Sequence, residues 1–119
     1  MMVSLMLHTE SRLKDAEMLA ISRALSDPVR LQMLRLLAQR RPACCEPASL
    51  PPGCPPEGIC VCEFVEQLDI IQSRASYHLK VLREAKLVQE QVCGRWNFYR
   101  LNRITLQRYL AALQQELLS

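Results

Sequence analysis

Six cysteines carry the most distinctive chemistry of this 119-residue chain. Five of them fall within nineteen residues, and the full set is Cys44, Cys45, Cys54, Cys60, Cys62 and Cys93. Thiolates prefer soft ions, which include trivalent arsenic and antimony, cadmium, lead, monovalent copper and zinc. Because the chain has only two histidines, His8 and His78, a mixed nitrogen and sulfur site is disfavoured. The clustering therefore predicts a thiolate site for a soft ion rather than cysteines that merely pack.

The predicted site is built on Cys60 and Cys62. Residues two apart on a regular helix point to nearly opposite sides, so one ion can bind both only where the chain is extended or the first helical turn gives way. For the third ligand we favour Cys54, which precedes Cys60 by five loop residues. The alternates are Cys44 and Cys45. Three thiolates suit pyramidal trivalent arsenic or antimony, whereas four suit cadmium or zinc.

Other uses of these cysteines stay open. A reversible disulfide between a loop cysteine and Cys60 or Cys62 would make a thiol redox switch, and a structural zinc loop would hold its metal permanently. A thiol enzyme is disfavoured because no acid or base group accompanies the cysteines, and histidine is absent from that region of the sequence. Cys93 is expected to lie at the wing, too far from the other cysteines to share an ion with them. The hairpin turn already explains the pairing of Cys93 with Gly94, so no ligand role is assigned to it.

Proline content and helical periodicity divide the first half of the chain. Helices are expected over residues 9–26 and from Pro28 to about Gln39, the second one capped by Asp27. Six of the seven prolines lie between residues 42 and 56, a density that neither helix nor sheet tolerates. Residues 42–59 are therefore expected to form an irregular loop that carries three of the cysteines.

The second half of the chain predicts a winged helix-turn-helix. Two short helices joined by a turn are expected over residues 62–86, and alternating residues over 87–101 predict a β-hairpin wing with Arg95 at its tip. The last helix, residues 103–118, is apolar on one face and needs a partner surface, which residues 9–26 and a second chain would supply. The expected fold is mainly α with a small β-hairpin wing, a single domain over residues 1–119, and homodimeric.

The helix that begins at Gln72 has two opposed faces. Its inward seam is predicted to be Ala75, His78, Leu79 and Leu82. The outward side carries hydroxyls, an amide, a phenol and a cation, which are the groups that reach base edges and phosphates in the DNA major groove. An ordinary amphipathic surface helix would show the same pattern. With the basic residues nearby, the predicted DNA contacts are Gln72, Ser73, Arg74, Ser76, Tyr77, Lys80, Arg83, Arg95 and Arg100.

Charge is unevenly spread along a chain whose net charge is only +3. Residues 72–103 hold seven basic and two acidic residues, whereas residues 57–69 hold four acids and no base. A polyanion such as double-stranded DNA would therefore be drawn to one end of the molecule. No apolar run in the sequence reaches transmembrane length. Together with the cysteine usage, this favours a cytoplasmic protein that acts on neither a membrane nor a small organic substrate.

The chain carries four motifs in a fixed order, ALSDPVRLQMLRLL (24–37), CVCEFVEQL (60–68), SYHLKVLREAKLV (76–88) and GRWNFYRL (94–101). In this order they resemble the ArsR/SmtB family of metal- and metalloid-responsive repressors. The resemblance implies a dimeric winged-helix repressor that binds an inverted-repeat operator and releases it when an ion binds. The Cys-Val-Cys followed by an acid is similar to the arsenic- and cadmium-responsive branches in particular.

Three departures from the family pattern bear on these expectations. The third cysteine of one arsenic-sensing pattern is Val65 here, so the family's ligand set does not transfer whole. The serine that often caps the recognition helix is Ile71, and a missing cap costs about 1 kcal/mol. The glycine usual after that helix is Lys86, which predicts a looser helix end. We expect a repressor that responds to trivalent arsenic or antimony, with cadmium, lead or zinc as alternative effectors.

Overall fold

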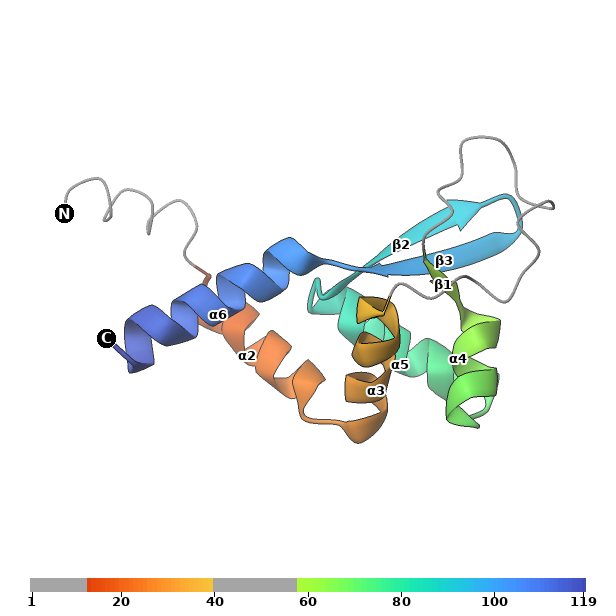
Figure 1. Ribbon diagram of the computed structural model, residues 1–119, viewed down its shortest axis with the longest axis horizontal. Helices are drawn as coiled ribbons and strands as arrows, with labels where there is room; N and C mark the ends of the chain where they lie inside the picture. Colours follow the sequence, from red (N-terminus) through yellow and green to blue (C-terminus); the bar gives the residue numbers. More distant parts are fainter. Residues whose placement is uncertain (1–12, 40–57) are drawn as a thin grey trace.

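The computed structural model describes residues 13–39 and 58–119 (Figure 1). In chain order these residues form α2 (Asp15–Leu25), α3 (Pro28–Ala38), β1 (Ile59–Cys60), α4 (Val61–Leu68), α5 (Gln72–Glu84), β2 (Val88–Cys93), β3 (Trp96–Leu101) and α6 (Arg103–Leu117). Helices α4 and α5 form the helix-turn-helix, and β2 and β3 form the hairpin wing, which confirms the predicted fold class. Residues 9–12 of the first expected helix and most of the expected 42–59 loop lie outside the described residues.

The turn between α2 and α3 follows from two adjacent residues. Asp27 occupies the N-cap of α3, where its carboxylate accepts hydrogen bonds from the backbone N–H groups of Val29 (2.8 Å) and Arg30 (3.2 Å). Pro28 fills the first helical position, which needs no N–H donor. Burial alone would raise the pKa of Asp27, but the two backbone hydrogen bonds hold that pKa below its usual value. The predicted cap is thus confirmed, and it stabilises the start of α3 by about 1 kcal/mol.

One continuous apolar core joins the helices to the sheet. Its largest fully buried side chains come from four helices, from β1 and from the residue before β2, and they are Ile21, Met33, Ile59, Phe64, Leu79, Leu82 and Leu87. The burial of Met33 at the centre of α3 agrees with the expectation that this helix is central to the core. Full burial of side chains of this size contributes roughly 1.5–3 kcal/mol each.

The wing has one more strand than the sequence predicted. The sheet order is β1-β3-β2, and β1 pairs antiparallel with β3 so that Ile59 lies opposite Tyr99 and Cys60 opposite Phe98. Figure 1 shows β1 between the hairpin and the start of α4. The prediction that residue 59 belongs to the irregular loop is wrong, because a two-residue strand is too short to produce an alternating pattern. The strand places Cys60 against the wing.

The hairpin turn agrees with the prediction. Cys93 pairs with Trp96, which leaves Gly94 and Arg95 as the two loop residues. Gly94 has a φ of 62°, while Arg95 has a negative φ. A single positive φ at the first loop residue is the type II′ arrangement, which requires glycine there.

Helix α6 lies across α2 (Figure 1). The hydroxyl groups of Ser22 and Tyr109 form a hydrogen bond of 2.8 Å between these two helices. Several large apolar side chains of the pair nevertheless face solvent, and they are Leu19, Ile104, Leu110 and Leu117. Within residues 13–39 and 58–119, no helix is long and apolar enough to cross a bilayer.

Candidate nucleic-acid interface and thiol site

Helix α5 separates its two faces as the sequence predicted. The inward seam of Ala75, His78, Leu79 and Leu82 is buried. The outward residues Gln72, Ser73, Arg74, Ser76, Tyr77 and Lys80 are all exposed. No side chain caps the helix, because Ile71 stands at the N-cap. Six of the nine predicted DNA contacts therefore lie on one exposed helical surface.

Arg30 of α3 connects α5 to the end of α2. Its Nε donates to the carbonyl of Ala24 (2.8 Å), its Nη2 donates to the carbonyl of Arg23 (3.1 Å), and its Nη1 lies 3.0 Å from Nδ1 of His78. A guanidinium can only donate, so Nδ1 accepts and the His78 proton sits on Nε2. This contact confirms that His78 belongs to the packed seam, and it shows that the residue also takes part in a specific polar contact.

The environment of His78 favours its neutral form. Burial lowers the pKa of His78 below its ordinary value of 6.5, and the cations Arg30 and Arg74 lower it further. The carboxylate of Asp27 opposes that shift. A proton on Nδ1 would also face the Arg30 guanidinium, so protonation and the Arg30 contact exclude each other.

The far end of α5 is attached to the wing through Glu90 of β2. Arg83 Nη1 forms an ion pair with Glu90 Oε1 (2.8 Å), and the other carboxylate oxygen accepts from the Tyr99 hydroxyl (2.7 Å) and more weakly from Asn97 (3.3 Å). Burial, followed by the hydrogen bond to Glu90, raises the pKa of Tyr99 to about 12. The network couples the orientation of the wing to that of the helix.

The last turn of α5 is closed rather than loose. Lys86 takes a left-handed conformation with a φ of 63°. The Leu87 N–H donates to the carbonyl of Leu82 (3.0 Å), and the Lys86 N–H donates to the carbonyl of Arg83 (2.9 Å). Bonds of this kind satisfy the terminal carbonyls in a Schellman-type end. The expectation of a looser end was wrong, because a lysine here adopts the conformation that glycine usually supplies.

The two wing arginines among the predicted DNA contacts differ in exposure. Arg95 is exposed at the turn, with its guanidinium 5.5 Å from the centre of the Trp96 ring, which is within cation–π range. Arg100 is only partly exposed, and its Nε is buried without a hydrogen-bond partner. Its side chain packs against Gly58. A Cβ atom added to this glycine would lie 3.5 Å from Arg100 Cγ. Arg95 is thus freely placed at the tip, whereas Arg100 is anchored in the sheet.

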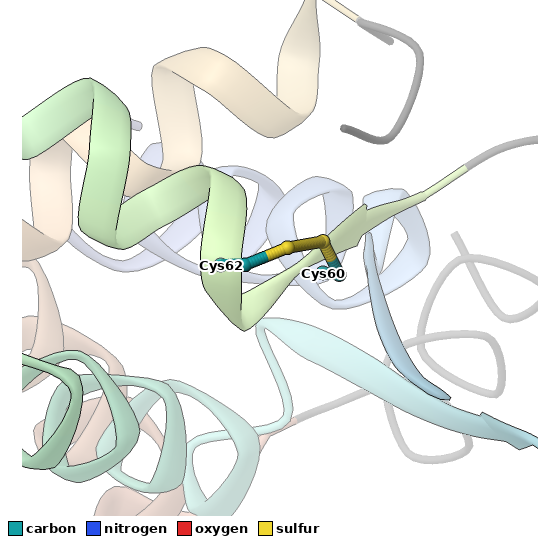
Figure 2. Close-up of a disulfide and its surroundings, with 2 residues drawn as sticks. All are labelled: Cys60 and Cys62. Atoms are coloured by element: carbon teal, nitrogen blue, oxygen red, sulfur yellow. A yellow bond between two sulfur atoms is a disulfide. The ribbon is translucent and has the colours of Figure 1, made fainter. Parts of the chain in front are cut away.

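Cys60 and Cys62 converge where β1 passes into α4. Cys60 is buried and extended (φ −82°, ψ 162°) at the N-cap, while Cys62 is exposed in the first helical turn. Their sulfur atoms form a disulfide, with the Cα atoms 5.4 Å apart (Figure 2). Of the two geometries that allow both thiols to reach one ion, the extended chain is the one observed. The predicted disulfides instead join Cys60 or Cys62 to Cys44, Cys45 or Cys54, which lie outside the described residues.

Cys93 lies closer to this corner than expected. It is buried, and it forms one cluster with Cys60 and Phe98, against which Trp96 packs. It is itself disulfide-bonded. The expectation that Cys93 lies too far away was wrong. Cys60 of β1 pairs with Phe98 of β3, and Cys93 of β2 pairs with Trp96 of the same strand β3, so both cysteines lie beside β3.

An open cleft of about 230 Å³ lies beside the cysteine pair. Its walls come from β1, α4, α5, β3 and the hairpin turn, and they include Cys60, Cys62, Gln72, Arg95, Trp96 and Asn97. Two predicted DNA contacts, Gln72 and Arg95, therefore border the same space as the two cysteines. Among the described residues, no three His, Cys, Asp or Glu side chains are grouped so that they could hold a metal ion.

Three residues that contribute to these sites are not among the predicted site residues, namely Arg30, Glu90 and Trp96. Each acts through a partner that is distant in sequence or on another strand, such as His78, which is 48 positions from Arg30. Periodicity records only which face of an element is apolar. The register set by the two-residue turn places Glu90 opposite Tyr99, but periodicity gives no signal for the contact of Arg30 with His78.

The comparisons agree with this architecture. Residues 58–90 match the family of bacterial regulatory proteins described as the arsR family. Over 80 residues the chain is 34% identical to the arsenical resistance operon repressor of Bacillus subtilis, an alignment that covers 67% of this chain and 61% of that repressor. The chain thus spans less than two thirds of that relative's length.

Solved structures share the fold. An ArsR-like transcriptional regulator from Rhodococcus superposes with a TM-score of 0.64 at 21% identity, over 84% of this chain and 78% of that one. A homodimeric winged helix-turn-helix DNA-binding domain from Mycobacterium bovis superposes with a TM-score of 0.58 at 19% identity, over 88% of this chain and 89% of that one.

The fold and the exposed face of α5 together define a winged helix-turn-helix domain. The chain carries a helix-turn-helix domain of the arsR family of bacterial regulatory proteins. The proteins it matches are transcriptional regulators rather than enzymes.

Proposed function

We propose that this protein is a homodimeric transcriptional repressor that releases operator DNA when trivalent arsenic or antimony binds the thiolates of Cys60 and Cys62. The observation that carries the proposal is the convergence of these two sulfur atoms beside Gln72 and Arg95. Thiolates are the protein ligands that soft ions prefer. The proposed third thiolate is Cys54, with Cys44 and Cys45 as alternates.

The proposed DNA contacts are the exposed face of α5 and the basic residues around it. Gln72, Ser73, Ser76 and Tyr77 would meet base edges in the major groove. Arg74, Lys80, Arg83, Arg95 and Arg100 would meet phosphates or the neighbouring minor groove. A single protomer offers one such helix, so an inverted-repeat operator requires two copies.

Ion binding would reach the DNA-binding surface by two short routes. Cys60 lies in β1, which pairs with β3 of the wing, and Cys62 lies in α4, which leads through a short turn into α5. An effector changes an equilibrium only through its differential affinity for two conformations. A coupling free energy of about 1–3 kcal/mol would change operator affinity by roughly 5- to 150-fold.

The proposed dimer uses the unpartnered apolar surface of α6. Ile104, Leu110 and Leu117 of this helix are each more than 60% exposed. Several large apolar side chains exposed on one element are typical of an interaction surface. The related domain from Mycobacterium bovis is homodimeric. Burying these side chains against a second copy would also set the spacing of the two recognition helices.

Operator release measured by fluorescence anisotropy tests the proposal. An operator duplex is selected by the reduced protein from a random library, and the complex is titrated with arsenite, antimonite, cadmium, lead and zinc. We expect arsenite or antimonite to release the DNA, and Cys60→Ser and Cys62→Ser to abolish release while leaving DNA binding intact. Release by arsenite that survives both substitutions would refute the proposal. Cys54→Ser tests the third ligand in the same assay.

A second candidate function is a thiol redox switch, which the observed Cys60–Cys62 disulfide favours. Two thiols and one hydrogen peroxide would give the disulfide and two water molecules. A peroxide titration of the same complex separates the two functions. Release by peroxide, reversed by a thiol reductant and absent with arsenite, would establish the redox switch in place of the ion sensor.

A further inference from the structure

Ile71 combines the position of a helix cap with the exposure of a surface residue. It stands at the N-cap of α5 in an extended conformation (φ −72°, ψ 155°), and its side chain makes no capping hydrogen bond. The side chain is 70% exposed, and among the large apolar side chains that the structure describes only Leu117 and Leu118 are more exposed. Serine, threonine, aspartate or asparagine at this position would satisfy an amide group of the first helical turn. Isoleucine therefore gives up helix stability here without adding to the apolar core.

The preceding residue shows that the core does not need Ile71. Asp69 ends α4 in a left-handed conformation with a φ of 52°, and the Ile70 N–H then donates to the carbonyl of Val65 (3.4 Å). Ile70 packs against the main apolar core, whereas Ile71, the next residue, faces solvent. The turn between the two helices thus buries one isoleucine and presents the other outward.

The exposed side chain of Ile71 lies at the start of the surface proposed to contact DNA. Gln72, Ser73 and Arg74 follow it directly, and all three are exposed. The Ile71 carbonyl accepts hydrogen bonds from the N–H groups of Arg74 (3.1 Å) and Ala75 (3.0 Å), which hold its backbone against the first turn of α5. The N-terminal residues of a recognition helix contact base edges in the major groove. The apolar group that base pairs present in this groove is the C5 methyl group of thymine.

Charge and position favour DNA over a second protein chain as the partner of Ile71. Residues 72–103 hold seven basic and two acidic residues, so this region attracts a polyanion and repels the same region of another copy. The exposed apolar side chains of α6, which the proposed dimer uses, lie at the other end of the molecule from the turn between α4 and α5 (Figure 1). The side chain of Ile71 is therefore separate from that apolar surface and adjoins the polar face of α5.

We propose that Ile71 is a specificity-determining residue that contacts the C5 methyl group of a thymine in each half of the operator. This inference rests on the DNA-binding function proposed above and adds a base preference to it. The polar side chains of α5 would recognise hydrogen-bonding groups of the bases, whereas Ile71 would recognise a group that forms no hydrogen bond. Burial of one methyl group against an apolar side chain corresponds to about a fourfold gain in affinity.

Replacement of thymine by uracil in the operator tests the inference. Uracil keeps the base pairing and the hydrogen-bonding groups of thymine but lacks the methyl group. Each thymine of the duplex selected by the reduced full chain is replaced in turn, and affinity is measured by fluorescence anisotropy. We expect at least one position in each half-site at which the wild-type chain loses about fourfold in affinity. Ile71→Ser should bind thymine and uracil equally at that position, and Ile71→Val should keep most of the difference.

The serine variant separates recognition from folding, because its two effects have opposite signs. Ile71→Ser supplies the missing cap, so the thermal midpoint should rise by a few degrees while the affinity for the thymine operator falls. Leu31→Ser removes an exposed apolar side chain from α3 and is the matched control. This control variant should keep the full preference for thymine.

The outcomes distinguish the inference from the function on which it rests. If the wild-type chain binds its operator but loses no affinity at any uracil position, or if Ile71→Ser keeps the loss, the inference is overturned and the proposed repressor stands. A changed oligomeric state of Ile71→Ser with an unchanged thymine preference would assign the residue to a contact between copies and would also overturn it. Failure of the wild-type chain to select any duplex refutes the proposed function and this inference together.

Discussion

Helix α5 and the cysteine corner lie side by side but are held in place very differently. The inward face of α5 is fully buried, and polar contacts tie the helix to α3 near its middle and to the wing near its end. The cysteine corner is attached to the sheet by a two-residue strand, exposes Cys62, and borders an open cleft. Helix α5 is therefore held along its length, whereas Cys62 of the cysteine corner lies exposed beside the cleft.

The largest difference between the two regions should appear in stability. Leu79→Ala in the α5 seam should lower the free energy of unfolding by about 2–5 kcal/mol, because the side chain is fully buried. Cys62→Ser under reducing conditions should change it by less than about 0.5 kcal/mol, because that position is exposed. Urea unfolding followed by circular dichroism measures both. Equal losses would show that the cysteine corner is as firmly packed as the helix seam.

The second largest effect on stability should come from breaking the polar contacts between α5 and α3. Arg30→Met removes the donor to His78 and to the two carbonyls at the end of α2. Leaving part-buried acceptors unpaired should lower the free energy of unfolding by about 1–3 kcal/mol. Operator affinity should also fall, because α5 is no longer held in position by Arg30. Arg35→Met, on the exposed side of the same helix, is the matched control and should be nearly neutral. An equally small effect of both changes would mean that packing alone positions α5.

The same link should make stability depend on pH. Burial lowers the pKa of His78 in the folded state below the ordinary value of 6.5, so the unfolded chain takes up the proton first as the pH falls. The contribution of this residue is therefore complete above pH 6.5 and is lost as the pH drops from there toward the folded-state pKa. Urea midpoints measured between pH 8 and pH 5 should show this loss. His78→Gln should flatten the curve in that range, and an unchanged curve would contradict the assignment.

The C-terminal end of α5 should be improvable by one substitution. Lys86 holds a φ of 63°, which costs a residue with a Cβ roughly 1–2 kcal/mol. Lys86→Gly should therefore raise the free energy of unfolding by about 1 kcal/mol, visible as a higher thermal midpoint. Lys86→Ala keeps the unfavourable conformation and should give no gain. A destabilised glycine variant would show that the lysine side chain itself supports the helix end.

The smallest effect should come from the ion pair between α5 and the wing. The Arg83 and Glu90 side chains are 44% and 23% exposed, so Glu90→Gln should lower stability by less than about 1 kcal/mol. The freed Arg83 should then strengthen operator binding, and the slope of log affinity against log salt should steepen by up to about 1. Glu84→Gln removes the same charge from an exposed position and serves as the control. Identical slopes in both variants would mean that Arg83 does not contact phosphate.

Local patterns accounted for most of the fold. Asp27 and Pro28 identified the start of α3, the seam around Leu79 identified the buried face of α5, and Gly94 identified the hairpin turn. Each signal lies within a few consecutive residues, because caps, helical faces and tight turns depend on neighbours in sequence. The two-residue strand β1 gave no such signal, and with it the position of Cys60 against the wing was missed.

The candidate site was predicted in its residue types but not in its arrangement. Clustered thiols and an exposed polar helix were evident from composition and spacing. Which side chains meet was not, since the contact of Arg30 with His78 and the cluster of Cys93 with Cys60 join residues more than thirty positions apart. The sequence by itself determined which surfaces could bind DNA and soft ions, because side-chain chemistry and helical period are local properties. Only the tertiary structure decided that both surfaces border one cleft, because strand pairing and core packing bring distant segments together.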